Sequence, residues 1–155
     1  ITIFVTMKIT TNRKAYFEFT VLEDFTAGIV LLGSEVKSIR DGNVNIANDC
    51  FVYIQNGELW AKNMKVARYS QSHAFQPHDE NRDKKLLLSR KEINKIEKLL
   101  QDKGTTMVPL EVFTLNNRIK IKLGIVKGKK LYDKRANIKE RDIKREISRE
   151  NNFNI

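Results

Sequence analysis

The segment FVYIQNGELWAKNMKV, residues 51–66, decides the fold class of this 155-residue chain. Two runs rich in aromatic and branched residues, 51–55 and 58–66, flank the dipeptide Asn56-Gly57. Aromatic and β-branched side chains favour strands, and Asn-Gly accepts the positive φ angles of a type I′ turn between antiparallel strands. The segment therefore predicts a β-hairpin and a protein built mainly from antiparallel sheet.

A second hairpin is predicted from MVPLEVFTL, residues 107–115, and RIKIKLGIV, residues 118–126, joined near Asn116-Asn117. Pro109 lacks a backbone donor, which predicts that the first arm begins at a sheet edge or a bulge. The second arm alternates aliphatic residues, which we expect to face the core, with lysines that face solvent. These are Ile119, Ile121, Leu123 and Ile125 against Lys120 and Lys122.

One helix is predicted between the hairpins, over residues 90–103. Ser89 and Glu92 have the S-x-x-E spacing of a capping box, in which the two side chains satisfy free backbone donors. Ile93, Ile96 and Leu100 recur on one face of a helix, and a glycine at position 104 is placed to end it.

The remaining pattern predicts the architecture. Residues 16–22 and 29–32 read as two strands separated by Ala27-Gly28, and the polar residues 70–84 read as a long surface loop. About six mostly antiparallel strands favour a closed barrel, because closure removes exposed sheet edges. We expect a monomer that is mainly β with helices. Its oligonucleotide-binding type barrel should span residues 8–127, with an extension or disordered segment at 1–7 and a basic tail at 128–155.

The net charge points to a polyanionic partner. The chain has a formal charge of +10, and residues 127–155 contain 10 basic against 5 acidic side chains, so half the excess lies there. Basic segments are attracted to nucleic acid, whereas the few aliphatic residues of this tail are too sparse for a lipid surface. So few apolar residues also predict a tail that is disordered or a solvated helix when free. Tyr132 can stack on an unpaired base. It lies among five side chains that can neutralise phosphates, namely Lys127, Lys129, Lys130, Lys134 and Arg135.

No pattern of catalytic residues emerges from the sequence. Cys50 is the only cysteine, which excludes a disulfide framework and fits a reducing cytoplasm. There is no zinc-protease motif, nucleophile elbow or glycine-rich phosphate loop, so we expect no enzyme, cofactor or metal. Two weaker alternatives stay open. One is a metal site from His73, His78, Asp79 and Glu80, for which an exposed loop is the default. The other is a nuclease-like acidic site from Glu35, Asp41 and Asp49, for which surface carboxylates are the default.

The segment GSEVKSIRDGNVNI, residues 33–46, is interpreted as a strand that presents charge on both faces. Alternation turns Glu35 and Lys37 to one side, and Val36 and Arg40 to the other. Asp41-Gly42 then reads as a turn.

Five blocks in the same order together resemble one family. They are NRKA at 12–15, GSEVKSIR at 33–40, LLLSRKEI at 86–93, MVPL at 107–110 and GKKLYDKR at 128–135. From Lys8 to Arg149 the chain is similar to the SsrA-binding protein (SmpB) family. The resemblance implies a bacterial RNA-binding adaptor that binds the tRNA-like domain of transfer-messenger RNA (tmRNA) and accompanies it into stalled ribosomes for trans-translation. It also implies that the tail, helical on the ribosome, enters the empty messenger channel beside the small-subunit decoding centre.

The resemblance also assigns residues. Contact with the tRNA-like domain is implied for Asn12, Arg13, Lys14, Glu35, Val36, Lys37 and Arg40. Glu35 is the anion of this set, and we expect it to accept hydrogen bonds from base amino groups or 2′-hydroxyls. Contact with the decoding centre is implied for Lys129, Lys130, Tyr132, Asp133, Lys134 and Arg135. A generic ribosome-associated or single-strand RNA-binding barrel explains charge and fold equally well, and a metal-dependent nuclease is the third alternative.

Overall fold

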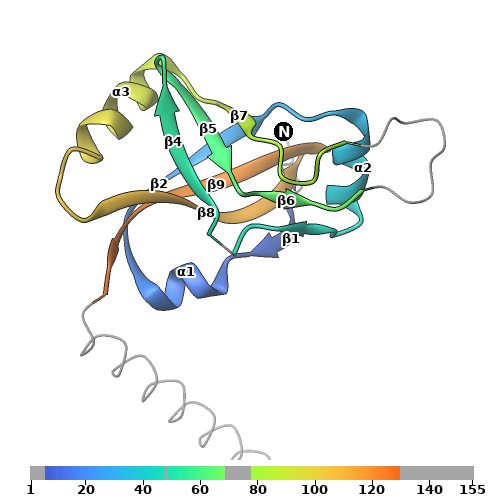
Figure 1. Ribbon diagram of the computed structural model, residues 1–155, viewed down its shortest axis with the longest axis horizontal. Helices are drawn as coiled ribbons and strands as arrows, with labels where there is room; N and C mark the ends of the chain where they lie inside the picture. Colours follow the sequence, from blue (N-terminus) through green and yellow to red (C-terminus); the bar gives the residue numbers. More distant parts are fainter. Residues whose placement is uncertain (1–5, 48, 69–77, 130–155) are drawn as a thin grey trace, which may run out of the picture.

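The computed structural model describes residues 6–47, 49–68 and 78–129. Most of this part is one antiparallel sheet of seven strands, in the order β1-β8-β4-β5-β7-β2-β9. Strand β8 also pairs with β9, so the sheet closes into a ring (Figure 1). The large strands are β1 (Thr6–Thr11), β2 (Phe19–Ile29), β4 (Phe51–Gln55), β5 (Glu58–Lys62), β7 (Lys84–Leu87), β8 (Thr105–Leu115) and β9 (Arg118–Gly128). The expectation of a mainly β protein with helices is confirmed.

The smaller elements lie around this ring. Strands β3 (Val44–Asn45) and β6 (Lys65–Val66) pair as a separate two-stranded sheet. The helices are α1 (Arg13–Glu18), α2 (Gly33–Arg40) and α3 (Arg90–Leu99). Figure 1 places α2 and α3 near opposite ends of the sheet, with α1 below it. Within the described residues there are thus nine strands and three helices, more than the six strands and one helix predicted.

Both hairpins are confirmed. Asn56 and Gly57 have φ angles of 53° and 74°, and Asn116 and Asn117 have 50° and 66°, as two-residue I′ turns require. The second arm of the first hairpin is shorter than predicted: β5 ends at Lys62, because the next residue takes a φ of 62°. The predicted bulge at Pro109 is also present, as a register shift between Pro109 and Glu111.

The alternation of β9 is confirmed. Ile121, Leu123 and Ile125 are fully buried inside the ring, while Lys120 and Lys122 are partly exposed. Helix α3 begins with the predicted capping box, in which Ser89 and Glu92 bond each other's backbone N–H. It ends at Leu99, earlier than predicted, and a turn leads to Gly104 at φ 80°.

The two strands predicted at 16–22 and 29–32 are confirmed only over residues 19–22 and at Ile29, which lie in one strand, so the break between them is wrong. Residues 13–18 form α1 instead, because the side chain of Asn12 accepts a hydrogen bond from Ala15 N (3.0 Å) and caps the helix. Strand β2 then runs without interruption from Phe19 to Ile29. Gly28 is not a turn: it pairs with both Lys120 and Leu87, and a Cβ there would lie 3.3 Å from Leu87 Cβ.

The N-terminal and loop boundaries also differ from expectation. Thr6 and Met7, expected in an extension, are the first residues of β1 and pair with β8. Within the predicted surface loop 70–84, His78 and Lys84 are buried, and Lys84 begins β7. Residues 69–77 of that loop lie outside the described part of the chain.

A substitution at Gly124 tests the packing inside the ring. A Cβ at this position would lie 2.6 Å from Leu110 Cδ1 and 3.0 Å from its Cγ, and Leu110 is fully buried. We expect Gly124→Ala to lower the free energy of unfolding by about 1–3 kcal/mol, because the core must shift to admit a methyl group. Gly128→Ala is the matched control, since nothing lies within 4 Å of the point that its new methyl group would occupy. Urea denaturation measures both, and equal midpoints would contradict the tight packing.

Candidate nucleic-acid interface

The segment 33–40 folds as helix α2, so the predicted strand there is wrong. A carboxylate oxygen of Glu35 accepts a hydrogen bond from Leu32 N (2.8 Å), which satisfies a free donor at the start of the helix. At the other end, Gly42 has φ 83° and its N–H bonds Ile39 O at 2.9 Å. Asp41-Gly42 is therefore the end of a helix rather than a turn after a strand.

Glu35 is fully buried, so the surface position taken as its default is also wrong. Arg82 Nη2 donates to one carboxylate oxygen at 2.5 Å and Arg82 Nε to the other at 3.3 Å. The ammonium of Lys84, also fully buried, lies 3.7 Å from the carboxylate and donates to the backbone oxygens of Met64 and Arg82. This buried network ties α2 to the start of β7.

Electrostatics keep this buried carboxyl ionised. Burial by itself raises the pKa of Glu35, but the hydrogen bonds from Arg82 and Leu32 and the charge of Lys84 together lower it below its ordinary value. Burial lowers the pKa of Lys84, and the charge of Glu35 opposes that shift. The two groups thus stabilise each other's charged form inside the protein.

Neither of the two weaker alternatives, the metal site and the nuclease-like acidic site, is assembled by its described residues, and His73 lies outside the described part of the chain. His78 bonds Ser34 Oγ through Nδ1 (2.8 Å) and Val66 O through Nε2 (3.0 Å), and it is buried rather than exposed. Asp41 and Asp49 are exposed, away from the buried Glu35. Among residues 6–47, 49–68 and 78–129, no group of three His, Cys, Asp or Glu side chains is placed to hold a metal ion.

A hollow of about 360 Å³, here called the basic hollow, lies where α2 meets the ends of β2, β7 and the β8–β9 turn. Arg40 reaches across it, and its Nη2 donates to Asn117 O at 2.7 Å. The floor is aliphatic and the rim holds three cations without an acidic residue. Its lining is Gly28, Ile29, Leu31, Val36, Arg40, Leu87, Asn117, Arg118, Ile119 and Lys120.

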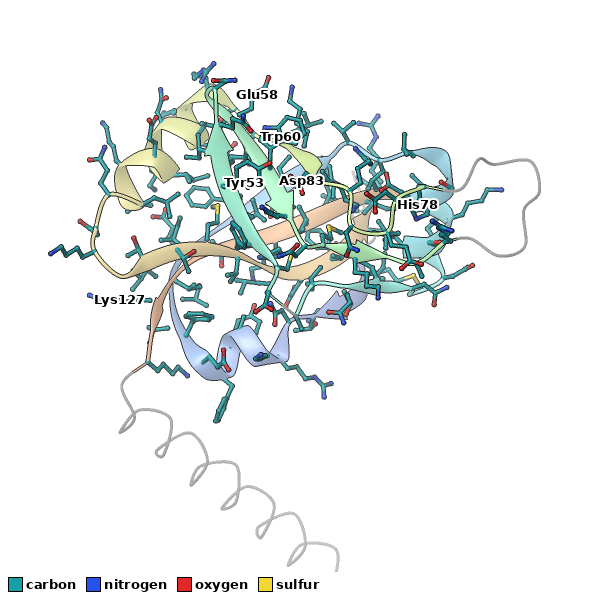
Figure 2. All side chains as sticks on the ribbon, viewed as in Figure 1. Tyr53, Glu58, Trp60, His78, Asp83 and Lys127 are labelled. Atoms are coloured by element: carbon teal, nitrogen blue, oxygen red, sulfur yellow. The ribbon has the colours of Figure 1, made fainter. Side chains whose placement is uncertain are left out.

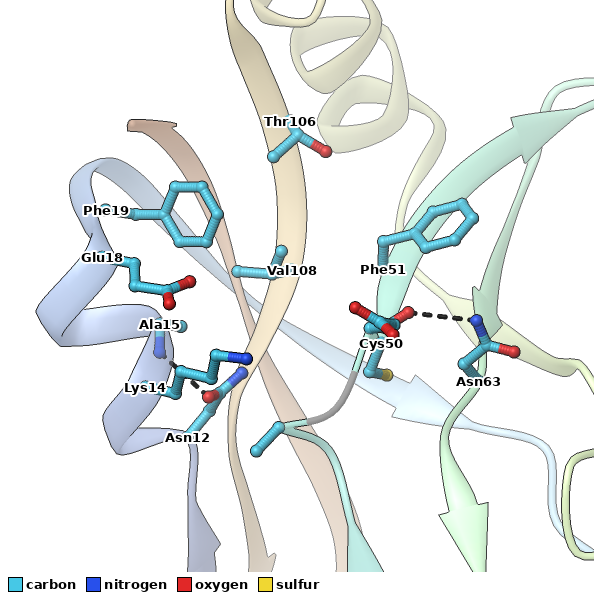
Figure 3. A pocket seen from close by; sticks show the side chains of 12 residues that line it. Asn12, Lys14, Ala15, Glu18, Phe19, Cys50, Phe51, Asn63, Thr106 and Val108 are labelled. Atoms are coloured by element: carbon cyan, nitrogen blue, oxygen red, sulfur yellow. Dashed lines mark hydrogen bonds between the residues drawn. The ribbon is translucent and has the colours of Figure 1, made fainter. Parts of the chain in front are cut away.

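A second cavity of about 400 Å³, here called the α1 cavity, lies between α1 and the start of β4 (Figure 3). Asn12 forms part of its wall: it is buried, and its side-chain amide donates to Ile46 O at 3.1 Å and Pro109 O at 2.9 Å. Lys14 lines the cavity as well, while Arg13 is exposed on α1. Asn12 therefore fastens α1 to the sheet.

The structure separates the two blocks of predicted contact residues. Phe19 lines the α1 cavity and Gly28 lines the basic hollow, and both belong to β2. Nine residues of strand at about 3.3 Å each place the two sites about 30 Å apart. Val36 and Arg40 thus belong to one site and Asn12 and Lys14 to another.

The predicted tail contacts fall mostly outside the described residues. This applies to Lys130, Tyr132, Asp133, Lys134 and Arg135. Lys129 is described: its backbone N–H bonds Glu18 O at 2.9 Å, and its Nζ donates to Tyr16 O at 3.1 Å. The point where the tail begins is therefore fastened to α1.

Sequence reasoning misses several residues of the basic hollow. Arg118 and Lys120 read only as residues of a strand with a solvent-facing side, and Asn117 only as a turn residue. A signal is present, because a basic hairpin tip next to a basic helix end concentrates positive charge. Recognising it needs the pairing of β9 with β2, which places Lys120 opposite Gly28 near the start of α2. None of the helices in the described ranges is long and apolar enough to span a membrane.

Comparison with known proteins finds relatives of this chain. The family model described as SmpB protein matches residues 9–152. The SsrA-binding protein of Treponema denticola is 47% identical over 139 residues, covering 90% of this chain and 89% of that protein. The SsrA-binding protein of Acetivibrio thermocellus is 50% identical over 138 residues, covering 89% and 88%.

A solved structure is also similar. It is described as "tmRNA-SmpB: a journey to the center of the bacterial ribosome", and one of its chains matches with a TM-score of 0.66 and 35% sequence identity. The match covers 79% of this chain and 85% of that chain. The family model spans well over half of the sequence, and the relatives agree with it over nearly their whole length. The chain therefore belongs to the SmpB protein family.

Proposed function

We propose that this protein binds the tRNA-like domain of tmRNA and carries it to stalled bacterial ribosomes for trans-translation. It acts as a cytoplasmic RNA-binding adaptor without catalysis of its own. The relatives named SsrA-binding protein and the similar tmRNA-SmpB structure support this function. The observation that carries it is the basic hollow, where Arg40, Arg118 and Lys120 meet without an opposing acid.

The chemistry of the basic hollow suits a folded RNA. Three cations at the rim neutralise phosphates, and the aliphatic floor of Val36 and Ile29 contacts the sugar or base surface of the same strand. An RNA whose phosphates follow the curve of the hollow contacts all three cations together, which an unstructured strand does only at an entropic cost. Recognition thus depends on shape as well as charge.

Two of the predicted contact residues, Asn12 and Glu35, are buried and do not reach a bound RNA themselves. Glu35 holds α2 in place, so that Val36, Lys37 and Arg40 face the RNA, and Asn12 does the same for Arg13 and Lys14 on α1. We therefore assign positioning roles to Glu35 and Asn12 rather than direct contacts. The closed ring with its interposed helix α3 supports an oligonucleotide-binding type barrel as the finer fold assignment.

The tail is proposed to act on the ribosome. We infer that residues 130–155 gain a helix in the messenger channel, and that Tyr132 stacks beside the decoding centre among Lys129, Lys130, Asp133, Lys134 and Arg135. The attachment of Lys129 to α1 supports a fixed starting point for this segment.

Arg40→Gln tests the basic hollow. We expect roughly tenfold weaker binding to the tRNA-like domain, since one charged hydrogen bond is worth about 1.5 kcal/mol, and a salt dependence reduced by about one unit of slope. The measurement is a titration at two salt concentrations, with an unstructured RNA of equal length for comparison. Lys91→Gln is the matched control, because Lys91 is exposed on α3 near the other end of the sheet.

Three outcomes separate the alternatives. Binding of the tRNA-like domain that survives higher salt better than the unstructured RNA supports shape recognition. Equal affinities that fall together, or equal losses in Arg40→Gln and Lys91→Gln, contradict it and favour a generic RNA-binding protein. Cleavage of the RNA on incubation with magnesium would point to a nuclease instead.

A further inference from the structure

Two aromatic side chains stand on opposite sides of the α1 cavity. Figure 3 shows the ring of Phe19 on the α1 side and that of Phe51 on the β4 side, with Val108 between them. Phe51 is 37% exposed, unusually high for a phenylalanine on a sheet whose inner face is packed. The volume of about 400 Å³ lies near the lower end of small-ligand sites, roughly 300–1,000 Å³. The cavity thus has room for one nucleobase next to aromatic side chains.

The polar groups of this cavity differ from those of the basic hollow. Lys14 stands at one wall, and the carboxylates of Glu18 and Asp49 add two negative charges. Throughout the described ranges, none of these three side chains forms an ion pair. A carboxylate accepts hydrogen bonds from amino groups and repels phosphate. The cavity therefore favours the edge of a base, with the sugar-phosphate chain held outside it near Lys14.

The wall opposite α1 is held in place by its backbone. Asp49 and Asn63 both have positive φ angles, of 55° and 62°, and Asn63 Nδ2 donates to Asp49 O at 3.1 Å (Figure 3). Cys50 contributes an inert thiol to the floor, since burial raises its pKa to about 12. These contacts fix the wall of the cavity that lies opposite α1.

An aromatic surface continues outward from the cavity. The rings of Phe51 and Tyr53 are 6.4 Å apart, and Tyr53 pairs across the strands with Trp60. Figure 2 shows Tyr53 and Trp60 beside each other on the outer face of β4 and β5. Lys62, which pairs with Phe51, adds a cation beside these rings, while Lys85, which pairs with Trp60, forms an ion pair with Glu58 at 3.0 Å. Aromatic side chains interleaved with lysines bind single-stranded nucleic acid by stacking.

We propose that the α1 cavity binds one unpaired RNA base between Phe19 and Phe51, at a site separate from the basic hollow. The neighbouring nucleotides of the same strand stack on Tyr53 and Trp60. Guanine is the preferred base, because it presents two adjacent N–H donors to a carboxylate, whereas uracil flanks its single N–H with two carbonyl oxygens. This inference rests on the proposed function only in taking RNA as the ligand.

The test uses the full chain and a hexaribonucleotide with 2-aminopurine in its centre, whose fluorescence is quenched by stacking. We expect quenching on binding to the wild-type protein. Phe51→Ser should weaken binding between about fivefold and a hundredfold, the range for loss of one aromatic stacking partner. Leu22→Ser is the matched control, since Leu22 is 55% exposed on β2 and lines neither the α1 cavity nor the basic hollow. Unlabelled hexamers with a central guanine should compete better than those with a central uracil.

A second variant guards against misfolding of the first. Lys14→Gln removes an exposed charge and should also weaken hexamer binding, whereas Lys91→Gln should not. Unchanged quenching in both Phe51→Ser and Lys14→Gln overturns the proposal. Absence of quenching with the wild-type protein overturns it as well, and would be expected if the cavity binds a protein side chain instead of a base. Equal losses for the hexamer and the tRNA-like domain in Phe51→Ser overturn the separateness of the site. Failure of the proposed function appears differently, as loss of tRNA-like-domain binding by the wild type with hexamer binding intact.

Discussion

A chain that ends at Lys129 is expected to bind the tRNA-like domain with unchanged affinity and to lose peptide tagging on stalled ribosomes completely. The basic hollow is built from β2, α2, β7 and the β8–β9 turn, all of which remain in this truncation. Ending the chain at Lys129 also keeps the two bonds that Lys129 makes to α1, so the last strand stays attached. This truncated chain is therefore expected to keep its RNA affinity while it loses tagging.

The measurement pairs an RNA-binding titration with translation of a messenger that lacks a stop codon, scored by tagged product. Tyr132→Ala and Tyr132→Phe refine the result, because only the second keeps a ring for stacking. We expect Tyr132→Phe to tag normally and Tyr132→Ala to tag poorly. Full tagging by the truncated chain would show that the tail is dispensable, and loss of RNA affinity would show that it belongs to the tRNA-like-domain site.

The hairpins are predictable because their signals are local. Asn-Gly and Asn-Asn dipeptides favour left-handed backbone angles at two adjacent residues. The alternation of aliphatic residues and lysines in 118–126 predicts which face of β9 is buried. Both depend only on residues next to each other in the chain. The capping box at Ser89 is of the same kind, and it too is confirmed.

Helix α2 escapes prediction because its buried face is polar. Ser34, Glu35 and Ser38 are buried beside Ile39, so the usual apolar spacing of a helix is absent. The partners that make this possible, Arg82 and Lys84, lie far away in sequence, since Arg82 is 47 positions from Glu35. A local pattern does not contain that information. The same reason explains why Val36 and Arg40 of the basic hollow are predicted while Arg118 and Lys120 are not. The helix end and the hairpin tip come together only through the pairing of β2 with β9.

Glu35→Ala is expected to lower the free energy of unfolding by about 3–5 kcal/mol, the cost of breaking a buried ion pair by removing one partner. The substitution leaves the fully buried ammonium of Lys84 without its counter-ion and removes the acceptor that satisfies Leu32 N. It should also weaken binding of the tRNA-like domain, because α2 positions Arg40. Glu35→Arg should do the same although it adds positive charge, and a rise in RNA affinity would contradict this.

Two controls isolate the ion pair. Glu97→Ala removes an exposed acid of α3 and should change the free energy of unfolding by less than about 0.5 kcal/mol. Lys84→Met replaces the buried ammonium by an apolar side chain of similar length. In the double variant Glu35→Ala with Lys84→Met we expect a loss smaller than the sum of the two single losses, since no fully buried charge is left unpaired. Strict additivity in urea denaturation would mean that the two groups do not interact.

The dependence of stability on pH gives an independent test of the same carboxyl. The pKa of Glu35 is lowered in the folded protein, so the unfolded chain takes up the proton at higher pH than the folded protein does. Its stabilising contribution is therefore complete above the unfolded pKa of about 4.3 and is lost as the pH falls through the lower folded pKa. Glu35→Gln carries no ionisable group at this position, so the difference in unfolding free energy between wild type and Glu35→Gln should shrink on acidification from about pH 6 to about pH 3. A difference that stays constant over this range would mean that the carboxylate charge does not stabilise the fold, and that only the shape and hydrogen bonds of the side chain matter.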